Sequence, residues 1–282
     1  MQIFETGVSN EFTREVALPE SEMNLARAAL LFAQSEYPKL NCDWYLEQLD
    51  LIADNISERS DPDAELGVRL AVMNDYLFGD LGYTGNSENY YDPRNSYLNE
   101  VIDRRVGLPI TLSIVFLELA HRVGLRACGV SFPGHFLVSV SEGNGDIIVD
   151  AFDGGVCLAR ERFLDRLQER VEANISLAVL ESTLAPASKA DILLRQLRNL
   201  KTVYVEQGEF EKSLNVANHM LTIDPDLVPE LIARGDLYDS LGYSRGAVMD
   251  YERALAQMPA GELQAEVRGR LGRVKEQAQH LH

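Results

Sequence analysis

Apolar side chains recur at helical spacing through the first part of the chain. The stretches DWYLEQLDLIADNI (43–56) and ELGVRLAVMNDYLF (65–78) each place apolar residues on one face, every three to four positions. This pattern predicts a mostly helical block over residues 22–82. The polar stretch GYTGNSENYYDPRNSY (82–97) contains two glycines and predicts a loop that ends the block.

The middle of the chain combines one helical pattern with three strand patterns. The stretch PITLSIVFLELAHRVGL (109–125) opens with a proline suited to a first helical turn, and its glycine predicts the helix end. The runs RACGVSF (126–132), HFLVSV (135–140) and DIIVDAF (146–152) have the composition of short strands. We therefore predict a helix packed on a small antiparallel sheet, with His135 at or just inside the start of the second strand.

The last third of the chain repeats itself with a shift of 34 residues. Each copy predicts two helices joined at a glycine and closed by a proline, and the stretch 262–282 predicts one further, capping helix. The copies superimpose Tyr204 on Tyr238, Gly208 on Gly242, Leu221 on Leu255 and Pro225 on Pro259. Small residues that would let the paired helices approach are Ser213, Ala217, Ala247 and Ala254.

This repeat resembles the tetratricopeptide repeat. Two copies are fewer than the three usually needed for a free-standing array. One interpretation is that the array packs as a buttress on the preceding domain. The other is that it offers a groove to a peptide of a partner protein, and the sequence leaves both open.

Charge and cysteine content narrow the choice of partners and location. The net charge is −18, and the first 92 residues hold 18 acidic and five basic side chains, so nucleic acid and anionic membranes are poor partners. The sequence contains neither a membrane-spanning apolar run nor a signal-peptide pattern, which predicts a cytoplasmic protein. Its three cysteines share no C-x-x-C spacing, so we expect no disulfide framework, no metal site and no cofactor.

His135 and Asp150 are the first candidates for chemistry. A histidine that opens one strand and an aspartate that closes the next can meet on neighbouring strands. A carboxylate that holds an imidazole is the orienting half of a nucleophilic triad. The same pair can instead be a buried polar contact that only fixes the edge of the sheet.

The order of these segments resembles the bacterial SirB-type family, a transglutaminase-like branch with a papain-related core and C-terminal tetratricopeptide repeats. The resemblance rests on four stretches. They are FAQSEYPKLNCDWYLEQLDLIADNI (32–56), SYLNEVIDRRVGLPITLSIVFLELAHRVGL (96–125), GVSFPGHFLV (129–138) and VDAFDGG (149–155).

The resemblance implies an α+β fold class with three parts. A helical N-terminal subdomain (1–92) precedes a transglutaminase-like core (93–188), in which a helix packs on a small antiparallel sheet. Together they form a domain over residues 1–188. An all-α tetratricopeptide-repeat domain with two repeats and a capping helix follows over residues 189–282.

Active members of the superfamily use a cysteine at the start of the core helix, a histidine base and an orienting aspartate. The resemblance assigns the histidine position to His135 and the aspartate position to Asp150. The cysteine position falls within Pro109–Thr111, where this chain has no cysteine. The hydroxyls of Thr111 and Ser113 are the remaining candidates, although a helix start and an imidazolium activate a hydroxyl far less than a thiol.

Three further residues of the matched segment are candidate binding residues. Asn99, Arg104 and Arg105 could line a cleft above the start of the core helix and bind an anion such as a peptide carboxylate. Salt bridges or solvation are the alternative for both arginines.

Two functions remain after these steps. We favour a non-catalytic protein- or peptide-binding or regulatory protein, built on a degenerate transglutaminase-like domain. The alternative is an unconventional amidohydrolase or acyltransferase that uses Thr111 or Ser113 with His135 and Asp150. Cys128 lies on a predicted strand, where we interpret it as a small buried apolar residue.

Overall fold

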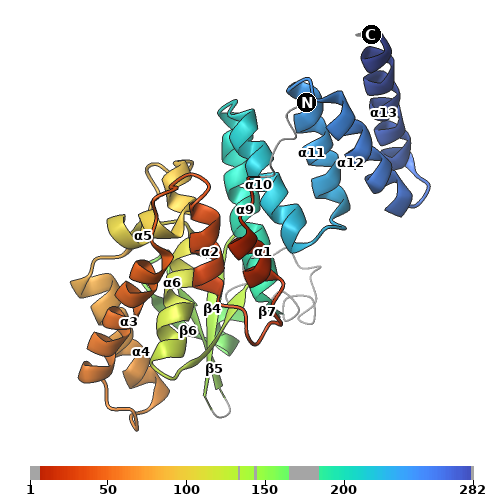
Figure 1. Ribbon diagram of the computed structural model, residues 1–282. Coiled ribbons are helices and arrows are strands. Elements are labelled where there is room, and N and C mark those ends of the chain that lie inside the picture. The colour runs from red at the N-terminus through yellow and green to blue at the C-terminus, as the bar shows by residue number, and fades with distance from the viewer. Residues whose placement is uncertain (1–6, 133, 143–144, 165–183, 281–282) are drawn as a thin grey trace. The chain divides into compact units, whose positions relative to one another are not determined.

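Figure 1 shows the computed structural model, which describes residues 7–132, 134–142, 145–164 and 184–280. Packing groups the described residues into two compact units. One comprises residues 18–196, and the other combines the segment before residue 18 with residues 197 onward. Because close packing is not the same as independent folding, the predicted domain boundary after residue 188 stays a prediction.

Helices make up the first part of the unit 18–196, which confirms the predicted helical block. Asparagines begin the first two helices of this block: Asn24 Oδ1 accepts from Arg27 N at 2.8 Å, and Asn41 Oδ1 from Trp44 N at 3.2 Å. The elements are α2 (Leu25–Ala33), α3 (Cys42–Arg59), α4 (Leu66–Asn74), the π-helix η1 (Asp75–Asp80), the 3₁₀-helix η2 (Pro93–Ser96) and α5 (Leu98–Arg104).

The core helix α6 (Pro109–Arg122) is buried on every side. Pro109 occupies the first turn as predicted, and Gly124 follows the helix end with φ of 76°. A residue other than glycine is strained at that angle. Because helices and strands surround α6, its buried residues from 109 to 120 form no single apolar stripe.

A five-stranded antiparallel sheet lies beside α6, with strand order β6-β5-β4-β3-β7. The three predicted strands are confirmed, and two further short strands were not predicted. The strands are β3 (Arg126–Val130), β4 (Leu137–Glu142), β5 (Gly145–Asp150), β6 (Val156–Ala159) and β7 (Pro186–Ala187). A parallel pair, β1 (Thr84–Gly85) and β2 (Val106–Gly107), forms inside and after the predicted loop.

His135 lies two residues before β4 rather than at its start or inside it. Its backbone N–H donates to Phe132 O at 3.1 Å, which closes a turn and keeps the residue out of the strand ladder. Both faces of the sheet are covered, since Leu137, Ile148 and Val130 pack with Leu164 and other side chains on the face away from α6. Residues 136–140 are therefore all buried.

The second unit is all-helical in the part that the structure describes. It contains α1 (Asn10–Val16), the end of α9 (Lys189–Glu206), α10 (Phe210–Ile223), α11 (Val228–Ser240), α12 (Ser244–Gln257) and α13 (Glu262–His280). The 34-residue period recurs in the backbone, because α10 and α12 begin and end 34 residues apart. Gly208 and Gly242 have φ of 76° and 77°, at turns closed by equivalent hydrogen bonds from Glu209 N and Tyr243 N.

Small residues bring these helices close together, as predicted. Ser213, Ala217, Ala247 and Ala254 are all fully buried. A Cβ atom on Gly235 of α11 would lie 2.6 Å from the ring of Tyr251 on α12. Val267 and Val274 of α13 complete the same apolar cluster, so the last helix covers α12 as the capping helix was expected to do.

Candidate functional site

A hydrogen bond joins the two residues that the sequence singled out. His135 Nε2 donates to Asp150 Oδ2 at 2.8 Å, with side-chain exposures of 30% and 25%. Asp150 Oδ1 accepts from Phe152 N at 3.0 Å and from Asp153 N at 3.2 Å, so the turn after β5 fixes the carboxylate. In this arrangement Nδ1 is the ring nitrogen left to accept a proton, as a general base must.

Aromatic side chains border the histidine. The ring of Phe152 lies edge-on to the imidazole, with centroids 6.1 Å apart, and Tyr90 packs against Phe152 at 6.2 Å. Gly85 of β1 permits this packing, because a Cβ atom there would lie 2.5 Å from the Phe152 ring. The pairing of Gly85 with Gly107 brings this wall toward the segment that leads into α6.

Arg195 of α9 holds the loop that carries His135. Its guanidinium donates to His135 O at 2.8 Å, to Phe132 O at 3.0 Å and to Ser131 Oγ at 2.6 Å. Burial lowers the pKa of this arginine. The sequence analysis missed Arg195, because an arginine in a helical pattern 60 residues from its partner gives no local signal.

The two candidate hydroxyls at the start of α6 are fully buried. Thr111 Oγ1 accepts from Leu108 N at 3.0 Å and donates to Asn95 O at 2.8 Å, so it serves to cap the helix. Ser113 Oγ has no hydrogen-bond partner among the described residues. Within that part of the chain, neither hydroxyl forms a hydrogen bond with His135.

None of the three cysteines lies at the start of α6, where the family places its nucleophile. Cys128 is half-buried on β3, and burial followed by the Asp146 carboxylate raises its thiol pKa. Burial also raises the pKa of Cys157 on β6. Cys42 is buried at the start of α3. A raised pKa disfavours the thiolate, the reactive form of cysteine, at Cys128 and Cys157.

The three candidate binding residues lie on and just after α5. Asn99 is buried and its Oδ1 has no partner among the described residues. Arg104 Nη2 lies 3.9 Å from Asp92 Oδ2. Arg105 has φ of 59°, and its guanidinium donates to Leu81 O at 2.9 Å. Binding of an anion by these residues stays a prediction.

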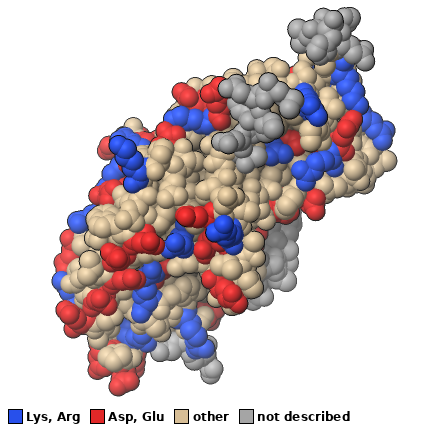
Figure 2. All heavy atoms as spheres, in the orientation of Figure 1, with Lys and Arg blue, Asp and Glu red and all other residues tan. Residues whose placement is uncertain are grey.

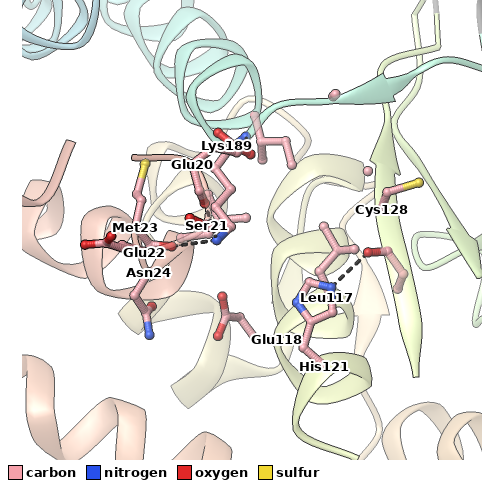
Figure 3. A pocket seen from close by; sticks show the side chains of 15 residues that line it. Glu20, Ser21, Glu22, Met23, Asn24, Leu117, Glu118, His121, Cys128 and Lys189 are labelled. Atoms are coloured by element: carbon pink, nitrogen blue, oxygen red, sulfur yellow. Dashed lines mark hydrogen bonds between the residues drawn. The ribbon is translucent and has the colours of Figure 1, made fainter. Parts of the chain in front are cut away.

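A cavity of about 380 Å³ lies away from the His135–Asp150 pair. Figure 3 shows Glu118 and His121 of α6 beside it and Lys189 on its opposite side. Lys189 Nζ donates to Glu20 O and Met23 O, at 2.9 and 2.6 Å. The sequence analysis did not find this cavity, because its walls come from four separate segments.

The described residues contain no cluster of three side chains suited to a metal ion. Among the same residues, no helix has the length and apolar content to cross a membrane.

A family model matches the part of the chain that contains the core helix, the sheet and the His135–Asp150 pair. The family model described as "Transglutaminase-like superfamily" matches residues 43–198. A UPF0162 protein of Xylella fastidiosa is 37% identical over 254 residues, covering 89% of this chain and 90% of that protein. The chain therefore belongs to the transglutaminase-like superfamily, in the group of UPF0162 and SirB-type proteins.

Two more distant relatives show how far the similarity reaches. Protein SirB1 of Salmonella typhimurium is 24% identical over 243 residues, covering 84% of this chain and 86% of that protein. Human F-box only protein 21 is 28% identical over 176 residues, which is 61% of this chain but 28% of that protein. No solved structure matches this chain significantly.

Proposed function

We propose that this chain is a non-catalytic protein- or peptide-binding or regulatory protein, built on a transglutaminase-like domain that lacks the nucleophilic cysteine. The observation that carries the proposal is the state of Thr111. Its hydroxyl stands within the segment where a nucleophile is expected, yet it is fully buried and hydrogen-bonded to backbone atoms on both sides. A hydroxyl in that state cannot attack an amide without breaking the cap of α6.

Under this proposal, the His135–Asp150 pair holds the conformation of a surface that binds a polypeptide. The pair and Arg195 both hold the loop before β4, one through the imidazole and the other through backbone carbonyls. Partly exposed polar groups held this firmly suit recognition of a polypeptide as well as they suit catalysis.

The helices α9–α13 are the second part of the proposal. We assign them to the tetratricopeptide-repeat class on their 34-residue period and on the glycine turns that recur with it. A partner peptide would bind these repeats or the cleft of the transglutaminase-like domain.

The setting of the proposal is cytoplasmic, with a protein as partner. On the face drawn in Figure 2, Asp and Glu side chains gather over the part of the molecule where Figure 1 places α3 and α4. Carboxylates repel phosphate groups, which disfavours nucleic acid and anionic lipid as partners.

An amide-turnover assay tests the proposal. Purified full-length protein is incubated with glutamine-containing peptides, with and without a primary amine, and ammonia release and amine incorporation are measured. We expect rates equal to those of His135→Ala and of the uncatalysed control. Turnover that disappears in His135→Ala would contradict the proposal.

One observation favours an amidohydrolase or acyltransferase as a second candidate. Ser113 Oγ is buried without a hydrogen-bond partner among the described residues, so its hydroxyl can still donate and accept a hydrogen bond. This candidate predicts labelling of Ser113 or Thr111 by a fluorophosphonate probe, located by peptide mass spectrometry. The labelling must be lost in His135→Ala, and Cys128→Ala is the control that should leave it unchanged.

A further inference from the structure

The outer edge of strand β3 is only partly paired in the part of the chain that the structure describes. β7 pairs antiparallel with Gly129 and Val130 and then stops. Continued in register, residues 188 and 189 would lie opposite Cys128 and Ala127. Instead Ser188 caps α9: Asp191 N donates to Ser188 Oγ at 3.1 Å, and Ser188 N donates back to the Asp191 carboxylate at 3.3 Å.

The cavity of about 380 Å³ lies beside the stretch that β7 leaves unpaired. Ala127, Cys128 and Gly129 of β3 line it, together with Ala187 and Lys189. A second, more open hollow of about 610 Å³ continues past Arg126 and shares His121, Ala127 and Cys128 with the first. The second hollow also reaches Ser141 of β4, on the other side of β3, so the two hollows meet at Ala127 and Cys128. We call the first hollow, which lies along the unpaired edge, the β3-edge groove.

His121 covers part of this edge. Its Nε2 donates to Ala127 O at 2.8 Å, as Figure 3 shows with a dashed line. In strand β3, the residue two positions further on is Gly129, which faces β7 in the register. Backbone groups two residues apart point to the same side of a strand, so Ala127 O points into the groove. An imidazole that occupies an edge carbonyl prevents unspecific pairing of that edge.

The charge at one end of the groove favours a cationic ligand. Glu20, Glu22 and Glu118 line the cavity, against Lys189 as the only lysine or arginine among its lining residues. Glu118 is engaged with Ala26 N and Arg122, and the Lys189 ammonium is held by backbone carbonyls. The Glu22 backbone N–H donates to Pro19 O, but its exposed carboxylate has neither a hydrogen bond nor an ion pair among the described residues, so this carboxylate is open to a partner.

We propose that the β3-edge groove binds an extended segment of a partner protein, which adds a strand beside Arg126–Cys128 and places a lysine or arginine at Glu22. Backbone hydrogen bonds to β3 supply the pairing, and apolar walls from Leu117 and Ile192 receive a side chain of the ligand. To pair with Ala127 O, the ligand's N–H displaces the His121 imidazole.

This inference rests on the proposed function only in expecting a polypeptide partner. The groove contains neither His135 nor Asp150, nor any residue of the helices α10–α13. If the groove binds no peptide, the result of the amide-turnover assay still stands. If the protein shows turnover that depends on His135, the proposal for the groove still stands.

A titration followed by nuclear magnetic resonance tests the groove. The probes are the blocked peptide Lys-Val-Thr-Val-Thr-Lys and the same peptide with alternate backbone amides N-methylated, added to ¹⁵N-labelled full-length protein up to millimolar concentration. The unmodified peptide should shift the amide signals of Ala127, Cys128 and residues 20–25. The methylated peptide, which keeps charge and side chains but cannot pair, should leave them in place.

Two substitutions should change the affinity in opposite directions. His121→Ala uncovers Ala127 O and should tighten binding several-fold, whereas Glu22→Lys should weaken it several-fold. Glu262→Lys, at an exposed glutamate of α13, is the matched charge control and should leave the affinity unchanged. Equal binding of both peptides, absence of shifts at β3, or weaker binding by His121→Ala would overturn the proposal.

Discussion

At the scale of single residues, burial decides the charge of His219. The side chain is almost fully buried in α10, where its ring packs edge-on against Phe12 with centroids 4.8 Å apart. Desolvation lowers its pKa from 6.5 to about 4, although the hydrogen bond between Nδ1 and Asn215 O acts in the opposite direction. The imidazole is therefore neutral in the folded protein at neutral pH.

This pKa predicts an acid-sensitive stability. Because the unfolded chain binds the proton more readily, stability is complete above the unfolded pKa of 6.5 and is lost as the pH falls toward 4. From pH 7 to pH 5, His219 alone should lower the free energy of unfolding by about 2 kcal/mol.

Urea unfolding at both pH values measures this loss. His219→Gln cannot titrate in that range and should lose less stability than the wild type between the two pH values. His121→Gln removes an exposed histidine but keeps His219, so the loss that depends on His219 should remain in this variant. Equal losses in all three proteins would contradict the assignment to His219.

Glu118 provides a second test at this scale. Its buried carboxylate accepts from Ala26 N at the start of α2, and its other oxygen accepts from Arg122 Nη1. Glu118→Ala leaves Ala26 N without its partner and removes the carboxylate that pairs with Arg122, whose Nη1 keeps only the backbone O of residue 118. We expect a loss of about 3 kcal/mol in unfolding free energy.

Glu118→Gln is the matched control, because it keeps an oxygen for Ala26 N while removing the charge that pairs with Arg122. Thermal and urea unfolding should place it between the wild type and Glu118→Ala. Indistinguishable stabilities of Glu118→Ala and the wild type would show that the two contacts contribute nothing measurable.

The candidate site could be predicted from the sequence only where its residues lie on neighbouring strands or directly beside them. His135 and Asp150 come together because β4 and β5 are joined by a hairpin, which the sequence indicates. Thr111 was placed correctly at the start of α6, but its backbone partner Asn95 lies in a separate helix and had no sequence signal. Arg195 was not predicted for the same reason, because its partner His135 lies in a distant segment of the chain.

At the scale of elements, two glycines of the helical unit have different roles. Gly235 of α11 faces Tyr251, where an added Cβ atom would lie 2.6 Å from a fully buried ring. At Gly272 of α13, an added Cβ would have no described atom within 4 Å other than those of its chain neighbours and its own helix backbone.

Substitution by alanine should therefore change the free energy of unfolding in opposite directions at Gly235 and Gly272. Gly235→Ala should destabilise the protein by about 1–3 kcal/mol, because Tyr251 cannot move aside in a packed core. Gly272→Ala should stabilise it by up to about 1 kcal/mol through helix propensity. Chemical unfolding of both variants measures the difference, and stabilisation by Gly235→Ala would contradict the close packing of α11 on α12.

Local pattern was a good guide to the long elements and a poor one to the short ones. The core helix and the 34-residue period carry many residues of consistent spacing, so sequence alone predicts them. β7 has two residues and β1 has two, and their pairing depends on distant segments. The sequence contains no local signal for such strands.

At the scale of the whole molecule, α1 packs against α10 although about two thirds of the chain lies between them in sequence. Phe12 of α1 is fully buried, and its contact with His219 joins α1 to α10. A reading from the N-terminus onward places residues 1–17 with the first domain. Packing groups residues 7–17 with residues 197–280, because the ring of Phe12 is buried against His219 of α10.

Phe12→Ala tests whether this segment stabilises the C-terminal unit selectively. The substitution removes a large buried side chain and should cost about 3–5 kcal/mol in that unit. Native-state hydrogen exchange, read by mass spectrometry, should then show faster exchange in α10 while α6 keeps its protection. Phe132→Ala, at a half-buried phenylalanine packed against the sheet of the other unit, should speed exchange in β3 and β4 instead. If either substitution speeds exchange equally in α6 and α10, the two units unfold as one, and the helical array is a buttress that shares its stability with the transglutaminase-like domain.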